Sequence, residues 1–125
     1  MRAFVLFFLL AMVSCNSASP EQQAVESAKA CYDLLVEGDA VRFLECKAGV
    51  DTLSADYGEQ LLEAVRQYQR DIQHKHGGLR EVRIADDQST FSTLQQSTLI
   101  LCYTDSTQEA IAVPMVERDG EWLMK

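Results

Sequence analysis

Positive charge is scarce in this sequence. Its 125 residues include 11 Lys and Arg against 19 Asp and Glu, which gives a formal net charge of −8. A surface of that sign repels the phosphate backbone of nucleic acids and the head groups of anionic lipids. We therefore expect no nucleic-acid partner and no electrostatic docking on a membrane.

Motifs that carry chemistry are also lacking. The sequence has no glycine-rich phosphate loop, no serine nucleophile elbow and no cluster with metal-ligand spacing. Its two histidines, His74 and His76, are two residues apart, whereas a metal-binding pair on a helix needs a spacing of three or four. The sequence thus predicts no metal, no cofactor and no catalytic residue, and a protein that is not an enzyme.

Long hydrophobic runs are missing as well. Residues 3–13 are apolar throughout, but this run is too short for a bilayer core, which needs roughly 20 residues in a helix. With Arg2 before it and the small Ser14 after it, the run matches the three regions of a signal peptide. The overall composition, 47% hydrophobic and 24% charged, is typical of one globular domain.

The end of this apolar run is more specific. The sequence MVSC at residues 12–15 resembles the bacterial lipobox, in which a small residue precedes a cysteine that becomes the lipid-bearing N-terminus, although Met12 stands where Leu is usual. The alternatives are an ordinary cleaved signal with an incidental Cys15, or a buried N-terminal helix. We predict a lipoprotein signal peptide at residues 1–14, a lipid-bearing Cys15 with a short tether at residues 15–19, and a domain at residues 20–125.

A lipid on Cys15 determines where the domain lies. Several acyl chains on one cysteine hold a protein firmly on a membrane, because each buried CH₂ adds about 0.8 kcal/mol. The tether of about four residues reaches no further than about 14 Å when extended. No acidic run follows Cys15. We expect a domain held close to a membrane of the bacterial cell envelope and facing the periplasm.

Helical signals begin at Ser19. This residue fits an N-cap, Pro20 fits the first helical position, and apolar residues recur at helical spacing until Gly38. The same pattern returns twice, each time followed by a glycine that ends the helix. The sequence predicts helices at residues 20–37, 40–48 and 54–76.

From residue 79 onward the apolar period changes to two, which is typical of strands. Asp119 and Gly120 fit a hairpin turn, and Pro114, which cannot donate to a ladder, is expected at a bulge or a sheet edge. Helices followed by strands indicate an α+β fold, with the N-terminal helices packed on a four-stranded, mostly antiparallel sheet. The predicted strands are residues 79–86, 97–105, 107–117 and 121–125.

Three short stretches resemble a known family. The helix break at residues 38–39, the turn at Asp105 and the terminal hairpin at residues 119–122 are similar to those of small bacterial lipoproteins with a lumazine-binding-like domain of unknown function. The match covers residues 20–125, with Ser106 where that family has glycine. The resemblance implies a cystatin-like cone with a curved sheet, similar to nuclear transport factor two and ketosteroid isomerase. It implies no catalytic residue.

The cysteines leave one question open. With Cys15 assigned to lipid, Cys31, Cys46 and Cys102 remain, an odd number for an oxidising compartment. Cys31 and Cys46 lie equally far from the break at residues 38–39, so an antiparallel helical hairpin places them at one level. Packed helix axes, however, lie roughly 8–10 Å apart, beyond the roughly 4.4–6.8 Å that bridged Cα atoms need. A disulfide and two buried thiols both fit the sequence, and Cys102 fits an inert core thiol.

The predicted strand at residues 97–105 is apolar on both faces, of which the helices cover one. Leu99, Leu101 and Tyr103 share a face, and we predict that they form a surface for a ligand or a partner. A second copy in a homodimer, another envelope protein or a small molecule could occupy it. The alternative is that the first helix or neighbouring loops cover both faces.

An enzyme remains the alternative function. Acid–base chemistry of the isomerase or dehydratase type in the cone cavity needs a carboxylate or histidine beside a hydrogen-bond donor. Residues 98–102 and 111–115 contain no Asp, Glu or His, so we favour a membrane-anchored module that binds a ligand or partner without catalysis. The candidates for the alternative are Tyr32, Asp33, Asp56, Tyr57 and Tyr103.

Overall fold

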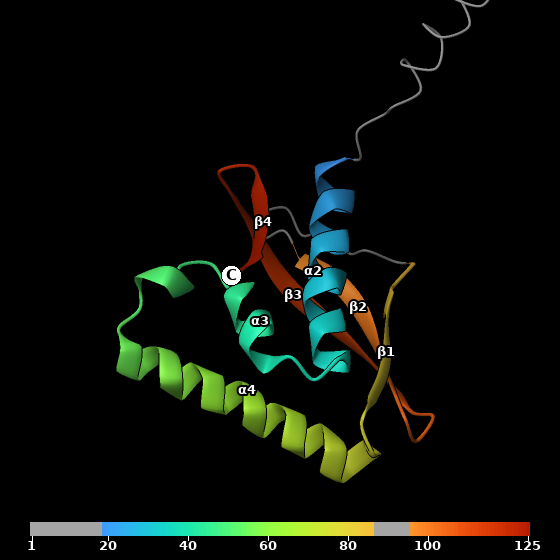
Figure 1. Cartoon of the computed structure of the whole chain (residues 1–125). Helices are drawn as coiled ribbons and strands as arrows, with labels where there is room; N and C mark the ends of the chain where they lie inside the picture. The colour runs from blue at the N-terminus through green and yellow to red at the C-terminus, as the bar shows by residue number, and fades with distance from the viewer. Residues whose placement is uncertain (1–18, 87–95) are drawn as a thin grey trace, which may run out of the picture.

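Figure 1 shows a computed structural model of the chain, which describes residues 19–86 and 96–125. The helical elements are α2 (Pro20–Val36), α3 (Ala40–Glu45), the 3₁₀ turn η1 (Val50–Thr52) and α4 (Ala55–His76). The strands are β1 (Leu79–Ile84), β2 (Gln96–Tyr103), β3 (Gln108–Arg118) and β4 (Glu121–Met124). They form one sheet in the order β1-β2-β3-β4, and each neighbouring pair is antiparallel. The predicted α+β fold is therefore confirmed. The predicted signal peptide and Cys15 lie outside the described residues.

Helix α2 supplies most of the cover for the sheet. The hydroxyl of Ser19 accepts a hydrogen bond from the backbone N–H of Gln22 (3.2 Å) and starts the helix at Pro20, as predicted. One stripe of the helix is buried and α2 contacts all four strands, which curve around it (Figure 1). The stripe consists of Ala24, Val25, Ala28, Cys31 and Leu35.

The inner face of the sheet contains the main core, and it corrects one prediction. Directly paired residues share a face, and Leu101 pairs with Val82 on β1. Leu99 and Leu101 are completely buried and Tyr103 is 3% exposed, in the same cluster as Ala24, Val25 and Ala28 of α2. The prediction that these three residues form an open surface for a ligand or partner is wrong. Alternation alone does not tell which face a helix covers, and here α2 covers theirs.

The short helix α3 ends earlier than predicted. It stops at Glu45 rather than near Gly49 because the backbone that follows pairs with β4. Met124 N–H donates to Cys46 O (2.8 Å), and Ala48 N–H donates to Met124 O (2.7 Å). These bonds hold the end of the chain against α3.

Pro114 lies within β3, which has β2 on one side and β4 on the other, so the prediction of a bulge or a sheet edge at this residue is wrong. It pairs with Gln96, the first residue of β2, while the ladder with β4 begins at Met115. The missing N–H therefore falls where one ladder ends and the next begins. The carbonyl of Pro114 still accepts a hydrogen bond from Lys125 N–H (2.9 Å).

Helix α4 has the extent that the sequence predicts. The Ser54 side chain accepts from Tyr57 N–H at its start, and Gly77, with φ 77°, caps its end. Only Ile72 of this helix is buried, because α4 packs chiefly on α3 and meets β1 near its own C-terminus. In Figure 1 it crosses below the C-terminal end of α2. No described helix is both long enough and apolar enough to span a bilayer.

A disulfide connects the first two helices in the structure. It joins Cys31 of α2 to Cys46, the residue after α3, with the Cα atoms 6.1 Å apart. Beside it, Phe43 of α3 packs edge-on against Tyr32 of α2, with ring centroids 5.1 Å apart. Cys102 is a buried free thiol. The disulfide and the aromatic pair fix α3 against α2.

Candidate functional site

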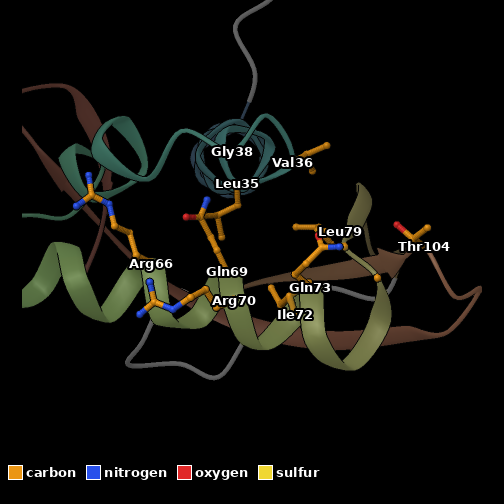
Figure 2. Close-up of a pocket in the computed structure, with 12 residues that line it drawn as sticks. Leu35, Val36, Gly38, Arg66, Gln69, Arg70, Ile72, Gln73, Leu79 and Thr104 are labelled. Carbon is orange, nitrogen blue, oxygen red and sulfur yellow. The ribbon is translucent and has the colours of Figure 1, made fainter.

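An open groove of about 650 Å³ lies between the C-terminal end of α2, the middle of α4 and the start of β1 (Figure 2). Its volume is within the range of about 300–1,000 Å³ that small-molecule sites have. The apolar part of its lining comes from three elements and consists of Leu35, Val36, Ile72 and Leu79. The polar part consists of Arg66, Gln69, Arg70, Gln73 and Thr104, together with Gly38, Gly77 and Gly78.

Local backbone geometry forms this groove. Residues 66, 69, 70 and 73 are three or four apart, so α4 presents them on one side. Gly38, with φ 82°, turns the chain away from the end of α2. Gly78, with φ 126°, turns it from α4 into β1, and an added Cβ there would lie 3.3 Å from Gln73 Oε1 and from Thr104 Oγ1. Both glycines line the groove and add no side chain to it.

The charged residues that line the groove are all of one sign. Its lining contains two arginines and no Asp or Glu, in a chain whose net charge is −8. Arg70 is already engaged, since its Nη2 donates to Glu63 Oε1 (2.6 Å) and to Gln67 Oε1 (2.8 Å). Within residues 19–86 and 96–125, no carboxylate forms an ion pair with Arg66. Arg66 is therefore the cation available to a bound molecule.

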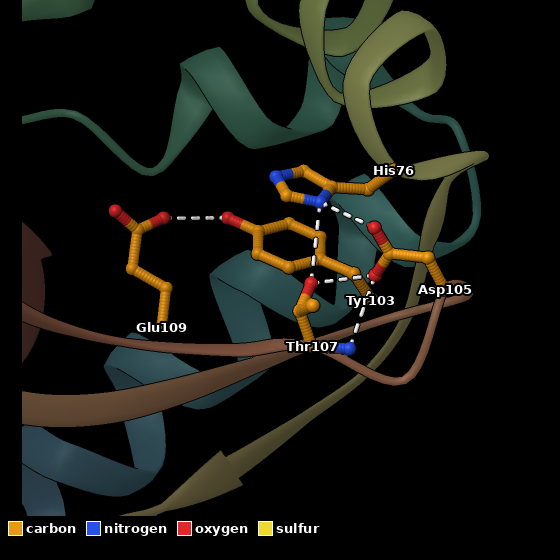
Figure 3. Close-up of polar contacts among 5 residues, drawn as sticks. All are labelled: His76, Tyr103, Asp105, Thr107 and Glu109. Atoms are coloured by element: carbon orange, nitrogen blue, oxygen red, sulfur yellow. Dashed lines mark hydrogen bonds and ion pairs between the residues drawn. The ribbon is translucent and has the colours of Figure 1, made fainter.

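A polar cluster lies beyond the C-terminal end of α4 (Figure 3). His76, the last residue of α4, faces the turn between β2 and β3, which a hydrogen bond from Thr104 N–H to Gly78 O (2.9 Å) holds in place. The Nδ1 atom of His76 lies 2.8 Å from Asp105 Oδ2. Because an ionised carboxylate only accepts hydrogen bonds, Nδ1 carries the proton, and Nε2 of the neutral ring is an acceptor.

Asp105 is fixed as an anion. The Thr107 side chain and backbone N–H both donate to its Oδ1, and His76 approaches its Oδ2. These hydrogen bonds, first that of the Thr107 hydroxyl and then that of His76, lower the pKa of Asp105 to about 2. Asp105 therefore orients the imidazole but cannot donate a proton near neutral pH.

Tyr103 lies against the imidazole of His76. It is held in its protonated form, whereas Asp105 is held in its ionised form. Its hydroxyl donates to Glu109 Oε1 (2.6 Å), and its ring stacks on His76. Burial and, after it, the hydrogen bond to Glu109 raise the pKa of Tyr103 well above its usual value. The phenol therefore stays protonated at any physiological pH.

Two more tyrosines belong to the same neighbourhood. Burial, with Tyr68 as the second cause, raises the pKa of Tyr32 to about 12. Burial raises the pKa of Tyr68 as well, and Glu109 is the second cause. Glu109 pairs with Leu101, so it lies on the inner face of the sheet, at an exposed position.

The residues proposed from sequence for acid–base chemistry are mostly apart. Asp33 pairs with Lys29 on α2 (2.9 Å), Asp56 lies in the first turn of α4, and Tyr57 is 50% exposed. Tyr32 and Tyr103 share one neighbour, Tyr68, which contributes to raising the pKa of each. Within the described ranges, no group of three or more His, Cys, Asp or Glu is arranged to hold a metal ion.

Sequence reasoning missed the groove and most of the polar cluster. Arg66, Gln69 and Gln73 have the pattern of an ordinary solvated helix face. His76 was considered only with His74, and its partner Asp105 only as a turn residue. The one available signal was their position, since His76 immediately precedes the chain reversal at residues 77–78 and Asp105 lies in the one at residues 104–107.

Comparison with known proteins supports the fold. No family model and no curated protein matches the sequence. A crystal structure at 2.00 Å of a Campylobacter jejuni protein, named as an NTF2-like transpeptidase, matches with a TM-score of 0.61 over 86% of this chain and 97% of that one. The two chains are 14% identical, so the likeness shows the fold alone. The chain has an NTF2-like cone fold, whereas membership of the lumazine-binding-like lipoproteins stays a prediction.

Proposed function

We propose that the protein is a lipoprotein of the bacterial cell envelope whose cone domain binds a ligand or partner without catalysing a reaction. The observation that carries the binding role is the groove of about 650 Å³ between α2, α4 and β1. The proposed anchor is Cys15, and the groove lies on a domain whose first helix begins only at Pro20. A tether that short holds the groove near the membrane surface.

The protonation states near the groove support a non-catalytic role. A general acid or base works best when its pKa is near the operating pH. Asp105 has a pKa of about 2, and the pKa of Tyr103 is raised above its usual value of 10.0, so neither group exchanges protons near neutral pH. The hydrogen bond between Asp105 and His76 instead connects α4 to the turn between β2 and β3, whose Thr104 lines one end of the groove.

Native mass spectrometry of the full chain, extracted from its own membrane in a mild detergent, tests the binding role. We expect a bound small molecule or partner on the wild type, and its loss in Val36→Trp, because Val36 lines the groove and a larger side chain fills it. Val41→Trp is the matched control, since Val41 is 50% exposed on α3 and does not line the groove. A wild type that is monomeric and free of ligand contradicts the proposal.

Metabolic labelling with an alkyne-bearing fatty acid tests the anchor. Cys15→Ala is expected to abolish the label, whereas Cys102→Ala, which removes a buried thiol, leaves it unchanged. Equal labelling of Cys15→Ala and the wild type rules out lipid on Cys15.

One observation favours the second candidate, an acid–base enzyme with a cone fold. Asp105 holds His76 so that Nε2 is an acceptor, and in Figure 3 this atom points away from Asp105 and Thr107. Such an imidazole could remove a proton from carbon beside a carbonyl. Exchange of α-protons in small ketones dissolved in D₂O would then be faster with the wild type than with His76→Gln, while His74→Gln, on the same turn of α4, has no effect. No difference between His76→Gln and the wild type removes this candidate.

A further inference from the structure

The groove has a shape that suits an elongated molecule. In Figure 2 its lining residues follow one another from Arg66 to Thr104, with α2 above and α4 below. Between these ends, Val36 of α2 and Leu79 of β1 are half-buried and offer aliphatic surface, while Leu35 and Ile72 beside them are each 6% exposed. A ligand that matches this arrangement has a long apolar body, because burying aliphatic surface contributes about 25 cal/mol per Å².

The positive charge of the groove lining indicates which head group the bound molecule has. Arg66 has no carboxylate partner within residues 19–86 and 96–125, and the groove lining contains no acid. The chain as a whole has 19 acidic residues against 11 basic ones, so a lining of this composition departs from the general surface. A guanidinium binds a carboxylate through two parallel hydrogen bonds, which a neutral head group cannot replace.

The two glutamines of the lining fit the same orientation. Gln69 is three residues after Arg66 and points from α4 toward Leu35 (Figure 2), so its amide lies within the groove. Gln73 continues this row toward Thr104. Amide groups of this kind accept and donate hydrogen bonds along the path of the ligand without adding charge.

From the aliphatic lining, the unpaired Arg66 and the absence of acids, we infer that the groove binds a single-chain amphiphile with a carboxylate head, of the fatty-acid type. The carboxylate lies at Arg66, and the chain runs along Leu35 and Ile72 toward Leu79. This inference rests on the proposed function, since it names the ligand class of the same groove. A domain held near a membrane has such molecules within reach.

Equilibrium dialysis of the full chain in phosphatidylcholine nanodiscs tests the inference. The probes are radiolabelled dodecanoate and 1-dodecanol, and empty discs of the same lipid give the baseline. We expect one dodecanoate per chain above that baseline, and about tenfold weaker binding in Arg66→Gln, the order of effect expected for losing a charged hydrogen bond. The alcohol binds more weakly than the acid and does not distinguish the two proteins.

Arg83→Gln is the matched control, since Arg83 is exposed on β1 and pairs with Ile100 on the face that α2 does not cover. It is expected to bind dodecanoate as the wild type does. Equal affinity of the wild type and Arg66→Gln for dodecanoate, an equal loss in Arg83→Gln, or no binding above empty discs overturns the inference. The proposed function is judged separately, because a bound molecule of another class in native mass spectrometry supports it even when dodecanoate does not bind.

Discussion

The imidazole of His76 lies flat on the phenol ring of Tyr103, with the ring centroids 3.9 Å apart and the planes at 9°. The two residues come from the end of α4 and the end of β2, and both are joined by hydrogen bonds to residues around the β2–β3 turn. Helix α4 has only one buried residue of its own, Ile72. The stacked pair is therefore a principal attachment of α4 to the sheet, and with it of one wall of the groove.

Removing the imidazole is expected to loosen this attachment in two separable ways. His76→Ala loses the stacked ring, worth about 0.5–1.5 kcal/mol, together with the bond to Asp105. His76→Phe keeps the ring and loses only the polar contact. Chemical denaturation of both variants is expected to rank them wild type, His76→Phe and His76→Ala, in order of falling stability. His74→Ala, on the exposed face of the same helix end, is the control. Equal stability of His76→Ala and the control contradicts a role in attachment.

The Asp105 carboxylate makes stability depend on pH in the acid range. Its pKa is lowered from 3.8 to about 2 in the folded chain, so the unfolded chain binds the proton first. The contribution of this group is fully present above about pH 4 and is lost as the pH falls through about 2. Thermal unfolding is expected to show a smaller loss of stability between pH 4 and pH 2 for Asp105→Asn than for the wild type. Parallel curves contradict the assigned hydrogen bonds.

Removing one partner of the hydrogen bond between Tyr103 and Glu109 is expected to cost more stability than removing the other. Glu109→Ala leaves the hydroxyl of a residue that is 3% exposed without its acceptor, at a cost of about 1–3 kcal/mol. Tyr103→Phe frees only an exposed carboxylate, which water can solvate, so its cost is smaller. Urea denaturation of the two variants measures both costs. A larger loss of stability for Tyr103→Phe than for Glu109→Ala contradicts the assignment of a buried donor and an exposed acceptor.

The disulfide between Cys31 and Cys46 leads to a prediction about the thiols. In the unfolded, unreduced chain, only Cys102 of the three cysteines after Cys15 is expected to react with an alkylating agent, as mass spectrometry can show. Replacing both bridged cysteines by serine is expected to cost about 3 kcal/mol, because the bridge closes a loop of about 15 residues. Cys102→Ala serves as the comparison for loss of a thiol. Three alkylated thiols in the wild type contradict the bridge.

The parts of the fold that local chemistry determines could be predicted from the sequence. Helix α4 begins and ends where Ser54 and Gly77 indicate, since both caps act within a few residues of the helix. Helix α3 was predicted too long, because the bonds that stop it come from Met124 at the other end of the chain. Local patterns do not contain such distant pairings.

The site was harder to predict for the same reason. The alternation in β2 separates Leu99 from Ile100 but does not say which of them α2 covers, and in the structure Leu99 is the buried one. Arg66 and Gln69 line a groove only because Leu35, from another helix, packs near them. His76 and Asp105 are 29 residues apart and meet only because two chain reversals lie side by side.

We propose that the protein binds its ligand in the groove between α2, α4 and β1. Photolabelling of the full chain in nanodiscs with a diazirine analogue of a fatty acid, followed by peptide mapping, tests it most directly. Labelled peptides are expected at residues 35–38 and 66–79, with much less label in Val36→Trp than in Val41→Trp. Label confined to the outer face of β2 and β3, or label that Val36→Trp does not reduce, would contradict it.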